Sequence, residues 1–261
     1  MIKQKKEIVL HIVDWHKTYS NNSRTEGFVI GISGGIDSAL TSTLCAMTGK
    51  KVICLNMPIR QHHTEYDRGN LHIQWLKNNY NNVSSFEVNL TSIFEEMEKV
   101  YDPQIQDFLT MANTRARLRM TTLYAYAGHH KLLVAGTGNK VEDFGIGFYT
   151  KYGDGGVDLS PIADLMKSEV YALAAEVGVV EAILNAKPTD GLFVDGRTDE
   201  DQIGATYDEL EWAMLYIEKN ETTKLSARQT EVLQIYLSRN KANKHKMDAI
   251  PVCLIPKELF L

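Results

Sequence analysis

Asp37 is an unusual residue for a phosphate-binding turn. It lies in the run Ser33-Gly34-Gly35-Ile36-Asp37-Ser38, between an apolar stretch at residues 28–32 and a helical pattern at residues 39–44. A strand that enters a helix through such a turn directs backbone N–H groups and the helix dipole at an anion. Since a carboxylate would repel a phosphate there, the pattern predicts Mg²⁺ between Asp37 and a polyphosphate. The alternative is a tight turn in which Asp37 caps the helix.

Two later stretches combine glycines with charged side chains. Residues 136–143 read Gly-Thr-Gly-Asn-Lys-Val-Glu-Asp, and residues 150–158 read Thr-Lys-Tyr-Gly-Asp-Gly-Gly-Val-Asp. Glu142, in the first stretch, is predicted to supply a second oxygen ligand to the magnesium ion, and a loop with a capping acid is the alternative. Lys167 begins an amphipathic helix, where the helix dipole disfavours a cation. This placement predicts a phosphate partner for Lys167, with a solvated lysine as the alternative.

The elements that must position these residues follow from hydrophobic periodicity. Strands are predicted at the apolar or alternating runs 28–32, 51–57, 84–88 and 131–135, and helices at 7–19, 39–44, 64–79 and 105–128. This alternation predicts an α/β fold, a doubly wound parallel sheet with helices on both faces. Ligands in such sheets bind beyond the carboxyl ends of the strands, where the loops after the first and fourth strands lie. The last hundred residues are predicted to be helices and loops, and the chain, residues 1–261, to be one domain.

Composition narrows the class of protein. With 28 basic and 33 acidic residues the net charge is −5, which argues against nucleic-acid binding. No apolar run approaches the ~20 residues of a membrane span, and the start of the chain leads into a polar helix. Cys45, Cys54 and Cys253 are too widely spaced for a disulfide framework or a zinc site, and are predicted to be small core residues. These features predict a cytoplasmic protein.

The motifs carry a resemblance to a known family. The turn at residues 33–38 resembles the pyrophosphate loop of the N-type ATP pyrophosphatases, a superfamily with a Rossmann-like sheet of the adenine nucleotide alpha hydrolase type. Residues 136–142 and 151–158 narrow this to a resemblance to bacterial ammonia-dependent NAD synthetase. Lys187-Pro188-Thr189, His245-Lys246 and the run 113–120, Asn-Thr-Arg-Ala-Arg-Leu-Arg-Met, are also similar to that family. The resemblance extends from about Gly27 to Lys246.

This resemblance implies a reaction and a set of roles. Deamido-NAD would be amidated to NAD with ammonia through an acyl-adenylate, with release of AMP and pyrophosphate and with Mg²⁺ as cofactor. The implied catalytic residues are Asp37 and Lys167, and the implied metal ligands are Asp37 and Glu142. The implied ATP contacts are Gly31, Ile32, Ser33, Gly34, Gly35, Ile36, Asp37, Ser38, Thr137, Lys167 and Thr189. The implied deamido-NAD contacts are Arg117, Lys151, Asp158, His245 and Lys246. The family also implies a homodimer with the substrate site near the interface.

Two alternatives and one departure accompany the resemblance. The synthetase domain of GMP synthetase shares the turn but should lack the run 151–156. A non-catalytic adenine-nucleotide-binding module would need the glycines of the turn but not Asp37 and Glu142 together. The loop between Glu142 and Lys151 is one residue longer than in some members of the family. Finally, the acidic segment 190–204 is predicted to be a lid over the substrates, with an ordinary surface loop as the alternative.

Overall fold

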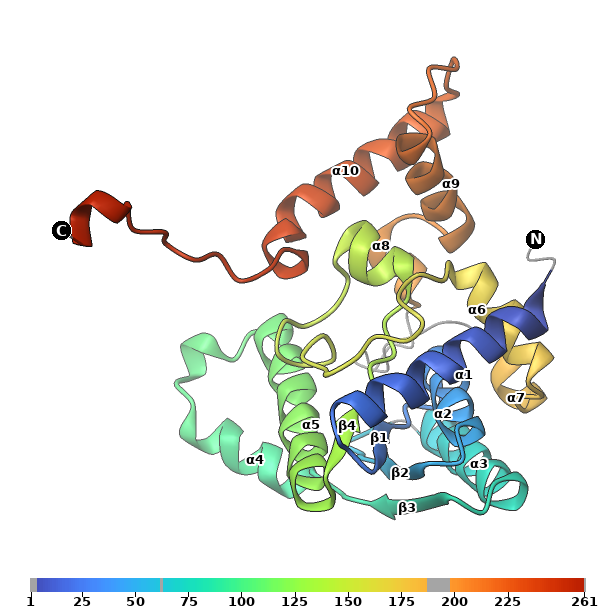
Figure 1. Cartoon of the computed structure of the whole chain (residues 1–261). Coiled ribbons are helices and arrows are strands. Elements are labelled where there is room, and N and C mark those ends of the chain that lie inside the picture. The colour runs from blue at the N-terminus through green and yellow to red at the C-terminus, as the bar shows by residue number, and fades with distance from the viewer. Residues whose placement is uncertain (1–3, 62, 187–197, 261) are drawn as a thin grey trace.

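A four-stranded parallel sheet forms the centre of the protein (Figure 1). The computed structural model describes residues 4–61, 63–186 and 198–260. The sheet has the order β3-β2-β1-β4. Its strands are β1 (Gly27–Gly31), β2 (Lys51–Asn56), β3 (Val83–Glu87) and β4 (Leu132–Val134). All four lie within a residue or two of the predicted runs, so the predicted parallel sheet is confirmed.

The strand order creates a crevice beside β1. After β1 the chain moves outward through β2 and β3, and it then returns to pair β4 with the other side of β1. Gly27 is therefore in register with both Lys51 and Leu132. At such a reversal the loops that follow the two neighbouring strands diverge, and ligands bind between them. An isolated parallel bridge between Ala135 and Leu159 extends the sheet at β4, which the sequence did not reveal.

Helices cover both faces of the sheet. Phe28 and Ile30 of β1 pack in one cluster with side chains of α2 (Ile36–Met47) and α3 (His63–Asn79). Val29, which points to the other face, packs in a second cluster with α4 (Thr91–Val100) and α5 (Phe108–His130). A parallel strand that is buried on both faces is apolar throughout, as β1 is. The predicted doubly wound arrangement is therefore confirmed.

Further helices surround this core. The first helix, α1 (Lys5–Asn22), packs with α2, α6 (Lys167–Glu176) and α7 (Glu181–Leu184) in a third apolar cluster. A fourth cluster joins α9 (Tyr207–Glu218) and α10 (Ala227–Met247) to the π-helix at Val141–Ile146. Figure 1 shows α9 and α10 above the sheet, and the loops after β4 lie between these helices and the sheet. The remaining short helices are α8 (Asp199–Ile203) and the 3₁₀ turns Pro103–Ile105 and Lys257–Phe260.

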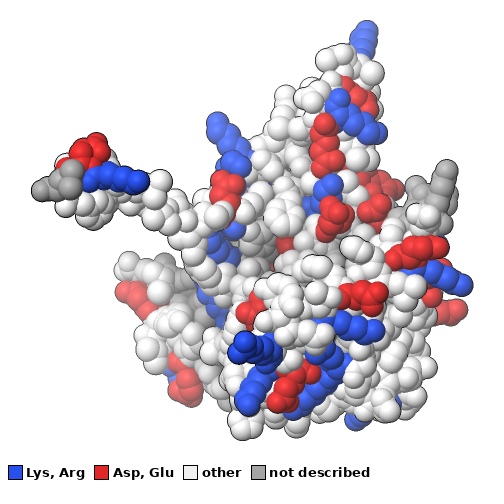
Figure 2. All heavy atoms as spheres, in the orientation of Figure 1, with Lys and Arg blue, Asp and Glu red and all other residues white. Residues whose placement is uncertain are grey.

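The chain beyond α10 leaves the body of the protein. Figure 1 shows it projecting to one side, and in Figure 2 it is uncharged until its tip. Val252 and Leu254 are 75% and 85% exposed, and Cys253 between them is exposed as well. Cys45 and Cys54 are buried as predicted, but the prediction that Cys253 is a core residue is wrong. Its apolar neighbours suggested burial, yet among the described residues they stay exposed.

Charge is mixed over the surface. Figure 2 shows lysines and arginines interspersed with aspartates and glutamates over the face in view. Within the described residues, no helix combines the length and the apolar character needed to cross a bilayer. The predicted lid, 190–204, lies largely outside the described residues. Of its later part, Asp199–Ile203 forms α8, with Thr198 as the cap.

Candidate active site

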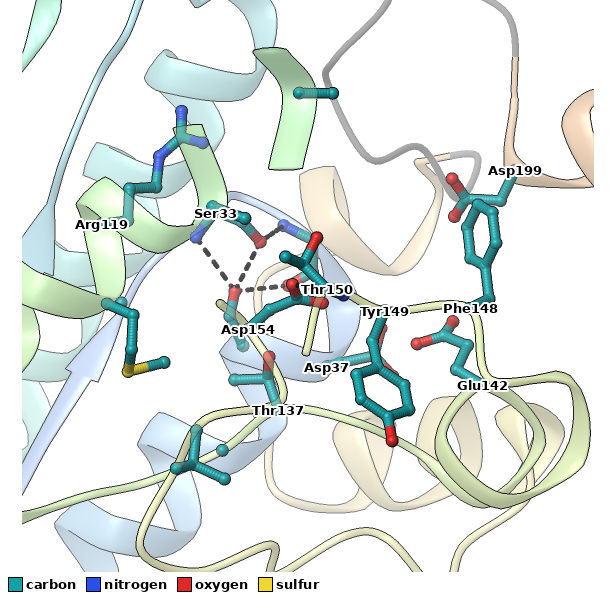
Figure 3. Close-up of a pocket in the computed structure, with 18 of the residues that line it drawn as sticks. Ser33, Asp37, Arg119, Thr137, Glu142, Phe148, Tyr149, Thr150, Asp154 and Asp199 are labelled. Atoms are coloured by element: carbon teal, nitrogen blue, oxygen red, sulfur yellow. Dashed lines mark hydrogen bonds between the residues drawn. The ribbon is translucent and has the colours of Figure 1, made fainter. Parts of the chain in front are cut away.

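A cavity of about 670 Å³ opens at the carboxyl ends of β1 and β4, between the sheet and α10. This volume is within the range of small-molecule sites, roughly 300–1,000 Å³. Its wall is made by the β1–α2 turn, by α5, by the two loops after β4, and by the starts of α6 and α8. Figure 3 shows Ser33 from the turn, with Glu142 and Asp199 on the opposite side of the view. The crevice predicted from the strand order therefore contains the pocket.

The turn after β1 is held open by its own serines. Ser33 Oγ accepts a hydrogen bond from the Gly35 N–H at 3.1 Å and lies 3.1 Å from Ser38 Oγ. The Ser38 hydroxyl in turn donates to the Gly35 carbonyl at 3.0 Å. Gly34 has φ +85°, and a Cβ there would collide with the Glu65 carbonyl oxygen of α3. Helix α2 begins directly after this turn, so its N-terminus faces the pocket.

Lys167 connects the two carboxylates that were predicted to bind magnesium. Its Nζ lies 2.7 Å from Asp37 Oδ2 and 3.0 Å from Glu142 Oε1. The three side chains are only 4%, 17% and 16% exposed, respectively. The predicted phosphate partner of Lys167 stays a prediction, and the partners that the structure shows are these two carboxylates. The alternative of a solvated lysine is wrong, since the side chain is buried.

Two neutral side chains hold these carboxylates in place. The Asn139 amide donates to Asp37 Oδ1 at 3.1 Å and accepts from the Glu142 N–H at 3.1 Å. The Tyr207 hydroxyl donates to Glu142 Oε1 at 2.5 Å. Sequence reasoning assigned no role to either residue. Asn139 lies inside the recognised run 136–142, which was a usable signal. By contrast, nothing local to Tyr207 indicates its contact with Glu142.

The charges of this cluster depend on one another. Burial raises the pKa of Asp37, and the adjacent Lys167 ammonium opposes that rise. Burial would also raise the pKa of Glu142, but Lys167 and the Tyr207 hydroxyl outweigh it and hold that pKa below its usual range. For Lys167, burial favours the neutral amine, yet Asp37 and Glu142 together raise its pKa. With both acids ionised, the three groups carry one net negative charge.

Glu142 lies on a π-helix. The segment Val141–Ile146 has this geometry, and Gly147, with φ +62°, ends it. A π-helical turn accommodates one more residue than an α-helical turn, and such turns occur often at functional sites. The following residue, Asp143, has its pKa raised to about 8, first by burial and then by the charge of Glu142.

Most of the predicted contacts line the pocket. They are Gly31, Ile32, Ser33, Gly35, Ile36, Asp37, Ser38, Thr137, Glu142, Lys167, His245 and Lys246. Gly34 belongs to the same turn but faces α3. Thr189 lies outside the described residues. The pocket shows where these residues lie but not what they bind, so the roles assigned to them remain predictions.

The other three predicted contacts lie beside the pocket. The Arg117 guanidinium donates to the Lys151 carbonyl at 3.2 Å, and Lys151 Nζ donates to the His245 carbonyl at 2.7 Å. These bonds connect α5, the loop after the π-helix and the end of α10. Asp158 accepts from the Val134 N–H at 2.8 Å and from the Tyr124 hydroxyl at 3.0 Å. In this structure Asp158 therefore fixes the end of β4, and its substrate contact stays a prediction.

The pocket also contains polar residues that the sequence analysis left without a role. The Thr150 hydroxyl donates to Asn113 Oδ1 at 2.5 Å, and the Thr150 N–H donates to Asp154 Oδ1 at 3.0 Å. The Arg119 guanidinium donates to the Met57 carbonyl at 3.0 Å. Burial lowers the pKa of Arg119 to about 10. Asn113, Arg119 and Asp154 belong to the recognised runs 113–120 and 151–158, and Thr150 directly precedes the second run, so the place of all four near the site could have been inferred.

Comparison with known proteins decides the family. The family model for NAD synthase matches residues 8–249. The chain belongs to the NAD synthase family. A relative from Methanosarcina acetivorans, named NH(3)-dependent NAD(+) synthetase, is 35% identical, with 92% of this chain and 95% of the relative covered. The predicted family is therefore confirmed, and the alternative that the chain is the synthetase domain of GMP synthetase is wrong.

Solved structures agree with this family. An NMN synthetase from Francisella tularensis is 31% identical with a TM-score of 0.82, covering 97% of this chain and 98% of that one. An NH3-dependent NAD synthetase from Campylobacter jejuni is 26% identical with a TM-score of 0.79, covering 96% and 99%. The predicted fold and enzyme class, a ligase that forms a carbon–nitrogen bond, are confirmed. The reaction of the family is the ATP-dependent amidation of deamido-NAD with ammonia.

Proposed function

We propose that this chain carries out the reaction of its family in the pocket between β1, β4 and α10. ATP would lie on the turn at residues 33–38, and deamido-NAD would extend toward the end of α10. The observation that carries this proposal is the buried cluster of Lys167, Asp37 and Glu142 beside that turn. A phosphate-binding turn next to a lysine and two carboxylates suits transfer of an adenylyl group, whose charges need cations.

The reaction solves a problem of reactivity. A carboxylate is a poor target for ammonia, because it is anionic and has no leaving group. The nicotinate carboxylate therefore attacks the α-phosphorus of ATP, which forms the acyl-adenylate and breaks the bond to pyrophosphate. Ammonia then attacks the acyl carbon, loses a proton and displaces AMP. Positioning and charge stabilisation suffice for both steps, so no protein nucleophile is required.

The chain's own groups would divide this work. The backbone N–H groups of the turn and the N-terminus of α2 would hold the phosphates. Lys167 is the first residue of α6, and its ammonium lies between Asp37 and Glu142. Its raised pKa keeps it charged, and it would stabilise the negative charge that develops on the pyrophosphate leaving group. Asn139 would keep Asp37 oriented while the substrates exchange.

Magnesium fits this site by the chemistry of its donors. Asp37 and Glu142 both reach a single cationic nitrogen, so both can reach one shared cation. In nucleotide sites Mg²⁺ is bound by one or two carboxylates together with substrate phosphates and water. Asp37 and Glu142 would hold the ion, which would neutralise charge on the phosphates of ATP. Among the described residues, no group of three or more His, Cys, Asp and Glu gathers as a metal cluster.

The deamido-NAD contacts would come from the opposite wall. His245 and Lys246 line the pocket at the end of α10, and Lys246 Nζ donates to the Tyr149 carbonyl at 2.6 Å. Burial lowers the pKa of Lys246. A cation that is costly to bury binds a phosphate or carboxylate more strongly than a solvated one. Arg117 and Lys151, beside the same wall, would extend this basic region.

The wider organisation is also part of the proposal. The family match over residues 8–249 supports a single synthetase domain. Free thiols at all three cysteines suit the reducing cytoplasm, where we place the reaction. We also propose a homodimer, which the family resemblance implies; Val100, Leu109 and Val252, which are apolar and 67–80% exposed, offer apolar surface for it. Sedimentation at several protein concentrations tests the dimer, and a monomer throughout would exclude it.

A mononucleotide substrate is the second candidate. The likeness to a structure titled NMN synthetase, at a TM-score of 0.82, favours it as a competing reaction at the same pocket. The same chemistry would then amidate nicotinate mononucleotide. One assay separates the two: the purified chain is given ATP, Mg²⁺ and ammonium with either acid, and pyrophosphate, AMP and the amide are measured. We expect a higher kcat/KM for deamido-NAD, and a preference for the mononucleotide would reverse the assignment.

A further inference from the structure

Tyr207 lies between two buried carboxylates. Its hydroxyl is 2.5 Å from Glu142 Oε1 and 3.3 Å from Asp199 Oδ2. Tyr207 and Asp199 are only 5% and 6% exposed. A phenol carries a single hydroxyl proton, so it donates to one carboxylate at a time. The shorter distance assigns that proton to Glu142.

The ring of Tyr207 contacts the cation of the same cluster. Lys167 Nζ lies 4.7 Å from the centroid of the ring. A cation over the face of an aromatic ring is attracted by the ring's quadrupole, and more strongly where water is excluded. One side chain therefore contacts both charged partners, Glu142 through its hydroxyl and Lys167 through its ring.

The backbone of Tyr207 is fixed from several sides. Tyr207 is the first residue of α9, and Thr206 caps that helix by accepting from the Glu209 N–H. The Tyr207 N–H donates to Glu200 Oε1 of α8 at 2.9 Å. The ring packs in the apolar cluster that α9 and α10 form with the π-helix. The hydroxyl is therefore held in one place, and a group that positions another residue must be held rigidly.

Glu142 has a particular need for such support. It stands on a π-helical turn, and π-helical turns are rare and short in proteins. We propose that Tyr207 is a positioning residue of the ligase, whose hydroxyl keeps the Glu142 carboxylate directed at the cation that it shares with Asp37. This inference rests on the proposed binding of Mg²⁺ by Asp37 and Glu142. None of the predicted contacts lies on α9, so the inference adds this helix to the site.

Tyr207→Phe tests the inference, because it removes the hydroxyl and keeps the ring over Lys167. Calorimetry measures the affinity of the full chain for ATP, once with Mg²⁺ and once with EDTA. We expect the variant to lose about tenfold in affinity with Mg²⁺, as for a lost charge-assisted hydrogen bond, and to match the wild type in EDTA. In turnover, the KM for Mg·ATP should rise more than kcat falls, and excess Mg²⁺ should restore the rate.

Tyr236→Phe is the matched control. Tyr236 is also buried, and its ring packs against Gly145 in the same cluster. This variant should bind ATP like the wild type under both conditions. Both variants should melt within a few degrees of the wild type, so that a loss in Tyr207→Phe reports on the site.

Two results would overturn the inference. One is an affinity for Mg·ATP in Tyr207→Phe equal to that of the wild type. The other is an equal loss with Mg²⁺ and with EDTA, since that pattern indicates general damage to the pocket. An ATP affinity of the wild type that does not depend on Mg²⁺ would be a separate result. It would refute the proposed metal role, and the inference with it, before any variant is measured.

Discussion

Lys167 Nζ lies 2.7 Å from Asp37 Oδ2, although 130 residues separate them in the chain. Asp37 is in the first turn of α2, and Lys167 is the first residue of α6. The two helices pack together in one apolar cluster, which brings their N-termini to the same end of the pocket. A lysine at a helix N-terminus is unfavourable by itself. The facing carboxylates offset that cost and leave Lys167 charged.

Asp37→Asn should leave a folded protein that hardly turns over. Asparagine keeps the size of the side chain but removes the charge, and with it a proposed magnesium ligand and the closest partner of Lys167. We expect a loss of about 10²–10³ in kcat, similar to that for a lost group that stabilises transition-state charge. Pyrophosphate release at saturating ATP and Mg²⁺ measures the loss, and circular dichroism checks the fold.

The control for this change is Asp164→Asn. The side chain of Asp164 is fully exposed, and its ion pair with Lys140 is long, at 4.0 Å. Exposed pairs of this kind contribute little. Turnover of Asp164→Asn should equal that of the wild type. Near-normal activity of Asp37→Asn would contradict the role assigned to that carboxylate.

Gly34→Ala should disable the turn that holds ATP. At φ +85° alanine is strained, and its Cβ would collide with the Glu65 carbonyl, so the turn and the start of α3 must separate. We expect at least a tenfold loss of ATP affinity, measured by calorimetry.

Gly49→Ala separates backbone strain from that collision. Gly49 also has a positive φ, +74°, but a Cβ there meets no atom within 4 Å. Its substitution should cost about 1–2 kcal/mol of stability, the cost of left-handed backbone, and leave ATP binding unchanged. If both variants bound ATP equally, the contact between Gly34 and α3 would be irrelevant to the site.

Acid should destabilise the protein through two buried histidines. His16 and His72 are fully buried, and burial lowers the pKa of each from 6.5 to about 4. The unfolded chain therefore binds protons that the folded chain does not, and stability is lost as the pH falls through 6.5 toward 4. Between pH 7 and pH 5 each histidine should cost about 2 kcal/mol.

Replacing His16 with leucine isolates one of these contributions. Leucine cannot ionise, so urea unfolding of His16→Leu should show a decrease between pH 7 and pH 5 that is about 2 kcal/mol smaller than for the wild type. His11→Gln, at an exposed position of the same helix, should show the full decrease. An unchanged decrease in His16→Leu would mean that His16 accepts a proton in the folded state.

Ammonia, and not glutamine, should be the direct nitrogen source of the purified chain. Glutamine hydrolysis usually needs an activated cysteine with a lowered pKa. Burial instead raises the pKa of Cys45 and raises that of Cys54 to about 12, and Cys253 lies in the projecting segment beyond α10. The amide should form from ammonium, and ammonium-free glutamine should yield none. Amide from glutamine alone would refute this expectation.

The sequence by itself determined the sheet and the position of the pocket. The run at residues 28–31 is apolar because both faces of a parallel strand are covered, and that pattern is local. The turn at residues 33–38 is also local, since its serines bond within six residues. Parallel strands joined by helices leave few possible orders, so the crevice after β1 and β4 could be predicted.

Only the tertiary structure decided how the charges are partnered. The contacts of Lys167 with Asp37 and Glu142, and of Tyr207 with Glu142, join residues 25–130 positions apart. They depend on how α6 and α9 pack, which hydrophobic periodicity does not specify. The same holds for Cys253, whose apolar neighbours suggested burial but are exposed in the part of the chain that the structure describes. Burial and charge pairing are properties of the packed molecule, and a local pattern indicates them only where one element contains both partners.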